Sequence, residues 1–375
     1  MSLVLTEEEV LLTDTAKDFF AQHSPVAKVR DLRANPKGLG YDPKVWQQMI
    51  EMGWSAIPFP EEVGGLGFSY QGLGSIFEVS GITLAASPLL NQTVLSGECL
   101  LNGANPDQIS QYLERLISGE DHWSLAIDEF HRHAPHSVAT VVKKSGDTYT
   151  LSGKKVFCFG AVGATHYIVS AIEDGDTELS LWIVHANTPG ITVSPFRSID
   201  HRNMANVQFD QVAVKQADKL SGALSAKAAL DLALDKGRAC LSGELLGITQ
   251  TVFDMTIEYM KQRIQFDRPI ASFQALQHRA ALMYTQIELA RSTVKAAFEA
   301  IDAKDSEMPK LVSLAKALSS SVAELVTNEA IQLHGGIGVT DEYDLGFYLK
   351  RARVAQASLG DVEFHQARYA SLINL

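Results

Sequence analysis

The sequence predicts an α+β protein in which a β-sheet segment lies between two helical segments. Apolar residues recur at helical spacing from residue 6 to about residue 120, and this spacing returns after about residue 220. Between these segments, short runs of β-branched and aromatic residues alternate with turn residues. We therefore expect an N-terminal helical domain over residues 1–120, a central antiparallel β-domain over 121–218 and a C-terminal helical bundle over 219–375.

The N-terminal segment carries clear helix-start signals. Thr6 and Glu9 have the spacing of a capping box, and Asp42 followed by Pro43 provides an N-cap and a first-turn proline. A loop rich in proline and glycine, 58–67, interrupts the helical pattern. The pattern then resumes at about 70–86, at about 90–102 and after Pro106.

The central segment has the pattern of short strands joined by turns. Gly146-Asp147 and Ser152-Gly153 are turn pairs between such runs. The expected strands cover 137–142, 148–151, 167–171, 179–184, 191–193 and 207–209. The C-terminal segment instead has three long helical patterns, over 226–262, about 273–302 and about 308–334.

Charge and cysteine content exclude several classes of protein. The chain of 375 residues has a formal net charge of −12, which disfavours nucleic acid and anionic membranes as partners. Apolar runs stay well short of the roughly 18 residues of a membrane span, and residues 1–9 contain three acidic residues and no basic one. The three cysteines lie far apart, which disfavours a disulfide framework or a structural zinc site. We expect a cytoplasmic protein.

Two C-terminal segments have the chemistry of phosphate recognition. Gly335, Gly336 and Gly338 follow a long helical pattern and allow a ligand to approach backbone amides closely. Arg263 and Arg268 lie at a predicted helix–helix corner, where their guanidinium groups suit a diphosphate. The alternatives are an ordinary glycine helix cap for the first segment and a solvated helix end for the second.

Two further parts of the sequence carry ionisable side chains that could act as a general base or as metal ligands. Glu244 lies within an apolar helical run, and burial raises the pKa of a carboxyl group, as a general base requires. The alternative is a structural glutamate that is hydrogen-bonded to a neighbouring helix. His131, His133 and His136 lie near Asp128, but their spacing fits no standard zinc pattern, so we expect solvated loop histidines and no metal.

Taken in order, these segments resemble the acyl-CoA dehydrogenase family over essentially the whole chain. The most specific similarity is the Arg263…Phe266…Phe273-Gln274 segment, followed about sixty residues later by Gln332…His334-Gly335-Gly336. The resemblance implies a C-terminal four-helix bundle and FAD between the β-domain and that bundle. It also implies that one subunit binds the FAD diphosphate through Arg263, Phe266 and Gln274, and its neighbour through Gln332, Gly335 and Gly336.

The β-domain resembles the family less closely where the flavin is expected. Residues 151–155 resemble the family's Asn-Gly-Lys-Lys hairpin, and its Trp-Ile-Thr strand becomes Phe157-Cys158-Phe159. We expect the ring of Phe157 to contact the flavin, whereas the hydroxyl donor is lost. Residues 127–137 keep little of the family's flavin-facing Thr-Glu-Pro-x-x-Gly-Ser-Asp pattern.

The family's catalytic base is also missing from both of its known positions. The C-terminal Tyr-Glu-Gly-Thr motif becomes Ser358-Leu359-Gly360-Asp361, and the alternative position before an arginine is Gly237 before Arg238. Glu244 lies seven residues beyond Gly237, about two helical turns, and is our first candidate. Asp361, on the C-terminal loop, is the second. Arg238 is a candidate substrate-binding residue.

The resemblance implies an oxidoreductase, EC 1.3, that converts an acyl-CoA thioester to its trans-2-enoyl form. A carboxylate removes the α-proton, the β-hydride passes to flavin N5, and the electrons continue to an electron-transfer flavoprotein. The ending 358–365 resembles bacterial subfamilies that include the pimeloyl-CoA dehydrogenase small subunit and steroid side-chain dehydrogenase subunits. The alternative is a non-catalytic or partial-site subunit of a heteromer. We expect a dimer or tetramer, formed with itself or with a related chain.

Overall fold

The computed structural model describes residues 5–35, 38–146 and 148–375, and the chain divides into two compact units. The helical unit comprises Met1–Ala34, Ser69–Ala85 and Arg238–Leu375, and the β-unit comprises Asn35–Phe68 and Ala86–Gly237. The predicted segment 1–120 is therefore shared between the two units. The three-domain division stays a prediction.

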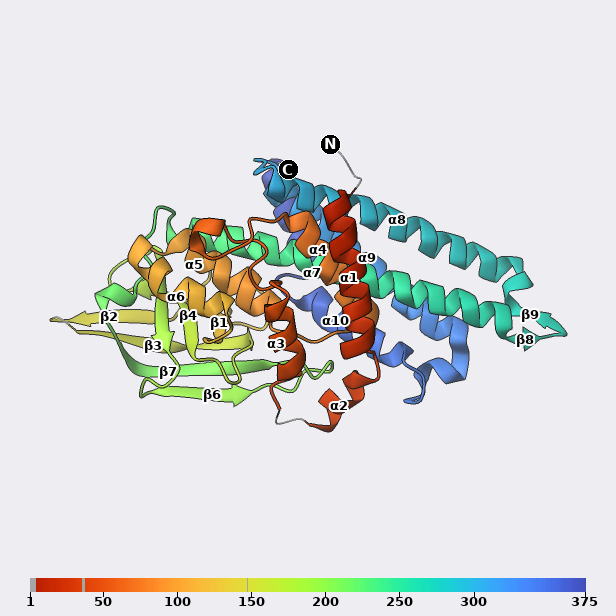
Figure 1. The fold of residues 1–375 in the computed structure, drawn as a ribbon, viewed down its shortest axis with the longest axis horizontal. Coiled ribbons are helices and arrows are strands. Elements are labelled where there is room, and N and C mark those ends of the chain that lie inside the picture. Colours follow the sequence, from red (N-terminus) through yellow and green to blue (C-terminus); the bar gives the residue numbers. More distant parts are fainter. Residues whose placement is uncertain (1–4, 36–37, 147) are drawn as a thin grey trace. The chain divides into compact units, whose positions relative to one another are not determined.

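Long helices form the helical unit (Figure 1). The predicted C-terminal helices are confirmed, with α7 at Ala226–Gln262, α8 at Gln274–Asp302 and α9 at Met308–His334. The unit includes α7 from Arg238 onward. Its other helices are α1 (Glu7–His23), α2 (Lys28–Ala34), α4 (Tyr70–Thr83), η4 (Ile270–Ser272), η5 (Gly335–Val339), α10 (Leu345–Ala357) and α11 (Val362–Leu372).

Local sequence signals explain where several helices begin and how closely two of them pack. The capping box of α1 is confirmed, since Glu9 N donates to Thr6 Oγ1 over 3.2 Å and Thr6 N donates to Glu9 Oε2 over 2.9 Å. Helices α4 and α7 pack backbone to backbone: a Cβ at Gly81 would collide with the carbonyl oxygen of Glu244, and one at Gly247 with that of Glu78. The backbones of the two helices are therefore in direct contact at Gly81 and Gly247.

A short hairpin joins α7 to α8 in Figure 1. It consists of β8 (Ile264–Gln265) and β9 (Arg268–Pro269). Phe266 and Asp267 form its turn with φ angles of 54° and 62°, values that match the right-handed twist of paired strands. The hairpin forms the corner between α7 and α8 at which the sequence placed Arg263 and Arg268.

A seven-stranded sheet forms the core of the β-unit, in the order β1-β4-β2-β3-β7-β6 with β5 also paired to β4. Most ladders are antiparallel, as predicted, but β4 runs parallel to both β1 and β2. The sheet is therefore mixed. Its strands are β1 (Trp123–Ala126), β2 (Val141–Ser145), β3 (Thr148–Phe159), β4 (His166–Glu173), β5 (Leu179–His185), β6 (Ile191–Pro195) and β7 (Met204–Val214).

The parallel pairs involve strands that are not consecutive in the chain, since β3 lies between β2 and β4, and both β2 and β3 lie between β1 and β4. The sequence did not predict β1, because four consecutive buried residues lack the alternation of a half-exposed strand. The predicted turn at Gly146-Asp147 includes Asp147, which lies outside the described residues, as do residues 1–4 of the N-terminus.

Short helices complete the β-unit: α3 (Pro43–Glu51), η1 (Glu61–Val63), η2 (Leu90–Gly97), α5 (Glu98–Gly103), α6 (Pro106–Ile117) and η3 (Gln216–Asp218). Asp42 caps α3 as predicted, with Oδ1 accepting from Lys44 N over 2.9 Å. The predicted helix at about 90–102 is a π-helix, η2, that continues into α5. Across the described residues, no helix combines the length and apolar character needed to cross a membrane.

Candidate active site

The C-terminal ends of α7 and α9 meet through the rings of Tyr259 and His334. Their centroids lie 4.4 Å apart with the planes 25° from parallel. His334 Nδ1 lies 2.8 Å from the carbonyl oxygen of Ala330, and Nε2 lies 3.2 Å from the hydroxyl of Tyr343. Burial lowers the pKa of His334, which keeps the ring neutral at pH 7. Because Arg263 follows Tyr259 by one turn and Gly335 follows His334 directly, both lie at this end of the helical unit.

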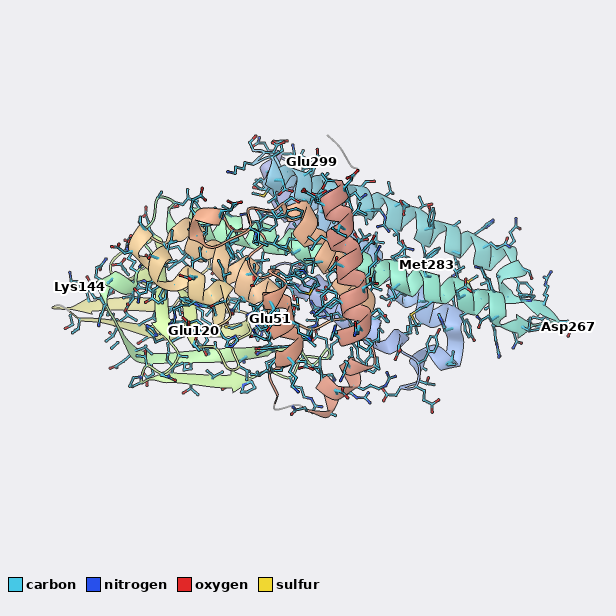
Figure 2. All side chains as sticks on the ribbon, in the orientation of Figure 1. Glu51, Glu120, Lys144, Asp267, Met283 and Glu299 are labelled. Carbon is cyan, nitrogen blue, oxygen red and sulfur yellow. The ribbon has the colours of Figure 1, made fainter. Side chains whose placement is uncertain are left out.

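The residues predicted to bind the diphosphate are open to solvent. Arg263, Gln274 and Gln332 are exposed, and the Phe266 side chain is 86% exposed at the hairpin whose tip carries Asp267 in Figure 2. A Cβ at Gly335 or Gly336 would have no atom within 4 Å, so a ligand can approach these backbone positions. An exposed guanidinium and accessible amides are donors that suit an FAD diphosphate.

Two arginines of α2 form ion pairs with the segment 341–344, which follows Gly335 and Gly336 in the chain. Arg30 Nη1 lies 2.7 Å from Asp344 Oδ1, and Arg33 Nη1 lies 2.5 Å from Asp341 Oδ1. The Arg30 guanidinium also lies 4.7 Å from the ring centroid of Phe347. Sequence reasoning missed this contact, because the partners are more than 300 residues apart and no local pattern connects them.

Glu244, the first candidate base, lies in a buried ion pair with Arg351 of α10. Arg351 Nε donates to Glu244 Oε1 over 2.8 Å, and Nη2 donates to Oε2 over 2.5 Å. Both residues are at most 5% exposed. This bidentate contact is what we expect if Glu244 is a structural glutamate, because a buried carboxylate needs a counter-charge. The catalytic role of Glu244 stays a prediction, and this geometry does not favour it.

Arg238, the candidate substrate-binding residue, is 2% exposed and contacts the C-terminal turn. Its Nε donates to the carbonyl oxygen of Leu359 over 3.0 Å, and His365 Nε2 lies 3.2 Å from the same oxygen. Lys316 Nζ donates to the next carbonyl oxygen, that of Gly360, over 3.1 Å. Three side chains from α7, α9 and α11 therefore converge on two consecutive carbonyl groups.

Lys316 is fully buried and makes two further contacts. Nζ lies 3.0 Å from the carbonyl oxygen of Gln356 and 3.2 Å from Ser320 Oγ. Burial and, to a smaller extent, the nearby charge of Arg238 together lower the pKa of Lys316 to about 7, against the opposing effect of Asp361. Burial and the charge of Arg238 also lower the pKa of His365, so its imidazole is neutral at pH 7. Sequence reasoning missed Lys316, since a lysine in a helical pattern is usually solvated.

Asp361, the second candidate base, is the N-cap of α11. Its Oδ1 accepts from the backbone N–H of Phe364 over 2.9 Å. The side chain is only partly buried, unlike that of Glu244. Asp361 also lies two residues beyond Leu359, so the structure brings this candidate, Arg238 and Lys316 to one turn. Glu244 instead contacts Arg351 of α10.

In the β-unit, Phe157 lies where β3 and β7 shift register, with a φ of 54°. Its N–H donates to Asn206 Oδ1 over 3.1 Å, and its ring meets that of Phe196 edge to face at 5.2 Å. Of the loop histidines, His133 Nδ1 lies 2.8 Å from Asp128 Oδ2, and His136 pairs with Asp231. Within the described part of the chain, no group of three or more His, Cys, Asp or Glu side chains is arranged to hold a metal.

Comparison with known proteins matches these features to one family. The N-terminal, middle and C-terminal domains of acyl-CoA dehydrogenase match residues 6–120, 131–212 and 227–371. Probable acyl-CoA dehydrogenase YngJ of Bacillus subtilis is 31% identical over 98% of each chain. Acyl-CoA dehydrogenase IpdE2 of Mycobacterium tuberculosis is 31% identical over 92% of this chain and 91% of its own. A structure of the Tcur3481-Tcur3483 steroid ACAD has a TM-score of 0.86 at 27% identity, covering 98% of both chains.

The fold and these matches define a flavin-dependent oxidoreductase. The chain belongs to the acyl-CoA dehydrogenase family, and it carries out FAD-dependent acyl-CoA dehydrogenation, EC 1.3, on an acyl-CoA substrate. The predicted family, fold class, activity and cofactor are thus confirmed. Relatives at about 30% identity do not distinguish the subfamily.

Proposed function

We propose that the chain binds the FAD diphosphate at the end of the helical unit defined by Tyr259 and His334. Arg263, Phe266 and Gln274 of one subunit and Gln332, Gly335 and Gly336 of its neighbour are the contacts, so the working form is a dimer or a tetramer. The exposure of these groups carries this proposal, because the Arg263 guanidinium and the open backbone at Gly335 and Gly336 are available both to a ligand and to a second subunit. Phe157 is the β-unit residue that we place against the flavin ring.

The reaction breaks two carbon–hydrogen bonds of the acyl group and forms the Cα=Cβ double bond. A carboxylate accepts the α-proton, and the β-hydrogen leaves with its electron pair. Bound FAD supplies the acceptor for this hydride at N5. We propose an electron-transfer flavoprotein as the protein that then receives the two electrons.

Among the chain's own carboxylates, we favour Asp361 over Glu244 as the base. Asp361 is partly exposed on the turn that carries Leu359, whereas both Glu244 oxygens accept hydrogen bonds from Arg351. A base must lie within hydrogen-bond reach of the substrate proton. Glu244 is 2% exposed and held by Arg351, so this geometry does not present its carboxylate to a ligand.

A second candidate function is that of a partial-site subunit in a heteromeric acyl-CoA dehydrogenase. The observation that favours it is Leu359, an apolar side chain that is 5% exposed at the position before Gly360. The steroid ACAD that is 27% identical to this chain carries the names of two proteins, Tcur3481 and Tcur3483, which supports this alternative. Its name also supports a bulky acyl group, such as a steroid side chain, as the substrate. The second subfamily to which we propose that this chain is related is that of the pimeloyl-CoA dehydrogenase small subunit.

The visible spectrum of the purified chain, alone and with a candidate partner chain, separates these proposals. We expect a yellow protein whose flavin band bleaches on anaerobic addition of an acyl-CoA. Bleaching by the chain alone would remove the partial-site proposal. Bleaching only in a mixture with a related chain would establish it. A yellow protein whose flavin band is not bleached by an acyl-CoA of any length, either alone or in the mixture, would contradict both proposals.

A further inference from the structure

Residues 335–342, which we call the glycine loop, lie between two side chains that close the base of the loop. His334 Nε2 lies 3.2 Å from the Tyr343 hydroxyl, and the centroids of the two rings lie 5.1 Å apart. Gly335 begins the loop with a φ angle of 61° and a ψ angle of −139°, a conformation that favours glycine. A Cβ at Gly338 would lie 3.0 Å from the Cβ of His334, so the loop packs against its own base.

Both arginines of α2 bind the residues at the end of the glycine loop. Arg33 Nη1 and Nη2 donate to Asp341 Oδ1 and Oδ2 over 2.5 and 2.6 Å, which is a bidentate contact. Arg30 Nη1 donates to Asp344 Oδ1 over 2.7 Å. Its Nη2 donates to the carbonyl oxygens of Asp341 and Glu342 over 3.1 and 3.4 Å. Helix α2 therefore holds both the side chains and the backbone where the loop ends.

Helix α2 has little apolar surface that could fix its own position. Of its seven residues, Val29 is the one that is buried. The guanidinium groups of Arg30 and Arg33 instead lie 4.7 and 5.8 Å from the ring centroid of Phe347, which is 5% exposed. Partly exposed ion pairs contribute little to the free energy of unfolding. The two arginines therefore affect the local geometry of the loop more than the stability of the fold.

We propose that Arg30 and Arg33 are positioning residues, which hold the glycine loop in the shape that its backbone needs to accept the FAD diphosphate. A loop that is already fixed loses less conformational entropy when the cofactor binds. This inference rests on the proposed function, since it assumes that the diphosphate binds at Gly335 and Gly336. The two arginines act on FAD through the loop and not by contact with it.

The carboxylate of Asp341 distinguishes this positioning from simple electrostatic attraction, because the two effects have opposite signs. A negative charge near the diphosphate repels it, so neutralising that charge strengthens FAD binding if the electrostatic field dominates. The same change releases the Arg33 guanidinium from the loop. It therefore weakens FAD binding if the shape of the loop dominates.

The test compares Asp341→Asn with Glu342→Gln. Glu342 is the matched control, because it is an exposed carboxylate one residue later whose side chain pairs with neither arginine in the described part of the chain. The rate of FAD release from the flavin-loaded protein is followed by the rise in flavin fluorescence. The FAD affinity of the apoprotein and its midpoint of thermal unfolding are measured beside it.

We expect Asp341→Asn to release FAD about two- to fivefold faster than the wild type, the range that a partly exposed ion pair supports. Glu342→Gln should release FAD at the wild-type rate or more slowly. The unfolding midpoint of the apoprotein should change little in either variant. Arg33→Lys keeps the charge but loses the bidentate contact, so it should also release FAD faster than the wild type.

Exchanging the two charges is the rescue experiment. Asp341→Arg alone places two cations together and should release FAD faster than Asp341→Asn, although it adds a positive charge near the diphosphate. Adding Arg33→Asp restores an ion pair of reversed polarity and should recover at least half of the lost retention. A positioning role requires this recovery, whereas a field effect does not.

The outcomes separate this inference from the proposed function. If Asp341→Asn retains FAD as well as Glu342→Gln does, or if the exchange restores nothing, the inference is overturned. Faster release together with an equally lowered unfolding midpoint would mean general destabilisation and would also overturn it. Arg263→Ala tests the site itself. If Arg263→Ala loses FAD and Asp341→Asn does not, the site stands without the positioning role. If Arg263→Ala binds FAD normally, the proposed site is wrong and this inference fails with it.

Discussion

Arg351 binds both carboxylate oxygens of Glu244, at 2.8 and 2.5 Å, inside the helical unit. The pair joins α7 to α10, the helix that leads directly into the Leu359–Gly360 turn. Both residues are at most 5% exposed, so each charge depends on the other for stabilisation. The pair therefore has a structural function whether or not its carboxylate also takes part in chemistry.

Replacing Glu244 tests whether this residue acts mainly as half of a structural ion pair or as the catalytic base. Glu244→Gln should lower the free energy of unfolding by about 3–5 kcal/mol, because it leaves the Arg351 charge buried and uncompensated. The rate of flavin reduction in the folded fraction should stay near that of the wild type. Thermal unfolding and anaerobic stopped-flow absorbance measure the two effects.

The matched control is Glu244→Met combined with Arg351→Leu, which removes both charges together. Apolar replacement of a buried ion pair is often neutral, so stability should recover relative to the single variant. A fall in flavin reduction by several orders of magnitude in Glu244→Gln, at normal stability, would instead make Glu244 the base.

Asp361→Asn separates catalysis from helix capping. Asparagine caps a helix about as well as aspartate, so the midpoint of thermal unfolding should change little. If Asp361 is the base, flavin reduction should fall by at least two orders of magnitude, since general base catalysis contributes about 10²–10⁴-fold. Asp361→Ala is the contrasting variant, and losing the cap should cost it about 1 kcal/mol of stability. An unchanged reduction rate in Asp361→Asn would place the base elsewhere, including on a partner chain.

Arg263→Ala should weaken FAD binding by about one to two orders of magnitude. A hydrogen bond to a charged group contributes about 1.5–3 kcal/mol, and every 1.4 kcal/mol is about tenfold in affinity. Lys261→Ala is the matched control, because Lys261 is an exposed cation two residues earlier that pairs with Glu258. Flavin retention on dialysis and titration of the apoprotein measure the difference. Equal retention by Arg263→Ala and the wild type would mean that the motif is misplaced.

Flavin occupancy should depend on the oligomeric state. If the diphosphate lies between Arg263 of one subunit and the Gly335–Gly336 amides of another, a monomer offers half of the donors. Light scattering across a dilution series should show flavin loss in step with dissociation. A stable monomer with full flavin occupancy would refute a shared site.

Lys316 should make stability depend on pH above neutrality. Its folded-state pKa of about 7 lies below the ordinary lysine value of 10.5, so the unfolded chain binds more protons between these two values. The free energy of unfolding should therefore gain a positive contribution that grows from pH 7 upward and is smallest below pH 7. Denaturant midpoints from pH 6 to 9 should rise more steeply in the wild type than in Lys316→Met. Parallel curves would show that Lys316 is not titrating in this range.

Local sequence signals predicted the features that neighbouring residues determine. Helix α7 has the bounds that apolar spacing indicated, and the Thr6–Glu9 capping box forms because both partners lie within one turn. The sheet was predicted less fully, since the parallel contacts of β4 depend on strand order rather than on any one segment. The partner of Glu244 could not be predicted from local sequence either, because Arg351 lies 107 residues away along the chain.

The Arg30–Asp344 and Arg33–Asp341 pairs have a consequence for how the protein is made. Asp344 leaves the ribosome 314 residues after Arg30, which at about 5–20 residues per second is a delay of roughly 15–60 s. During that interval α2 lacks the partners that fasten it to the segment after Gly336. Helix α2 therefore makes these contacts only after residues 341–344 have been synthesised. The backbone at Gly335 and Gly336 emerges in the same interval, so cofactor capture there follows the folding of the first helices by tens of seconds.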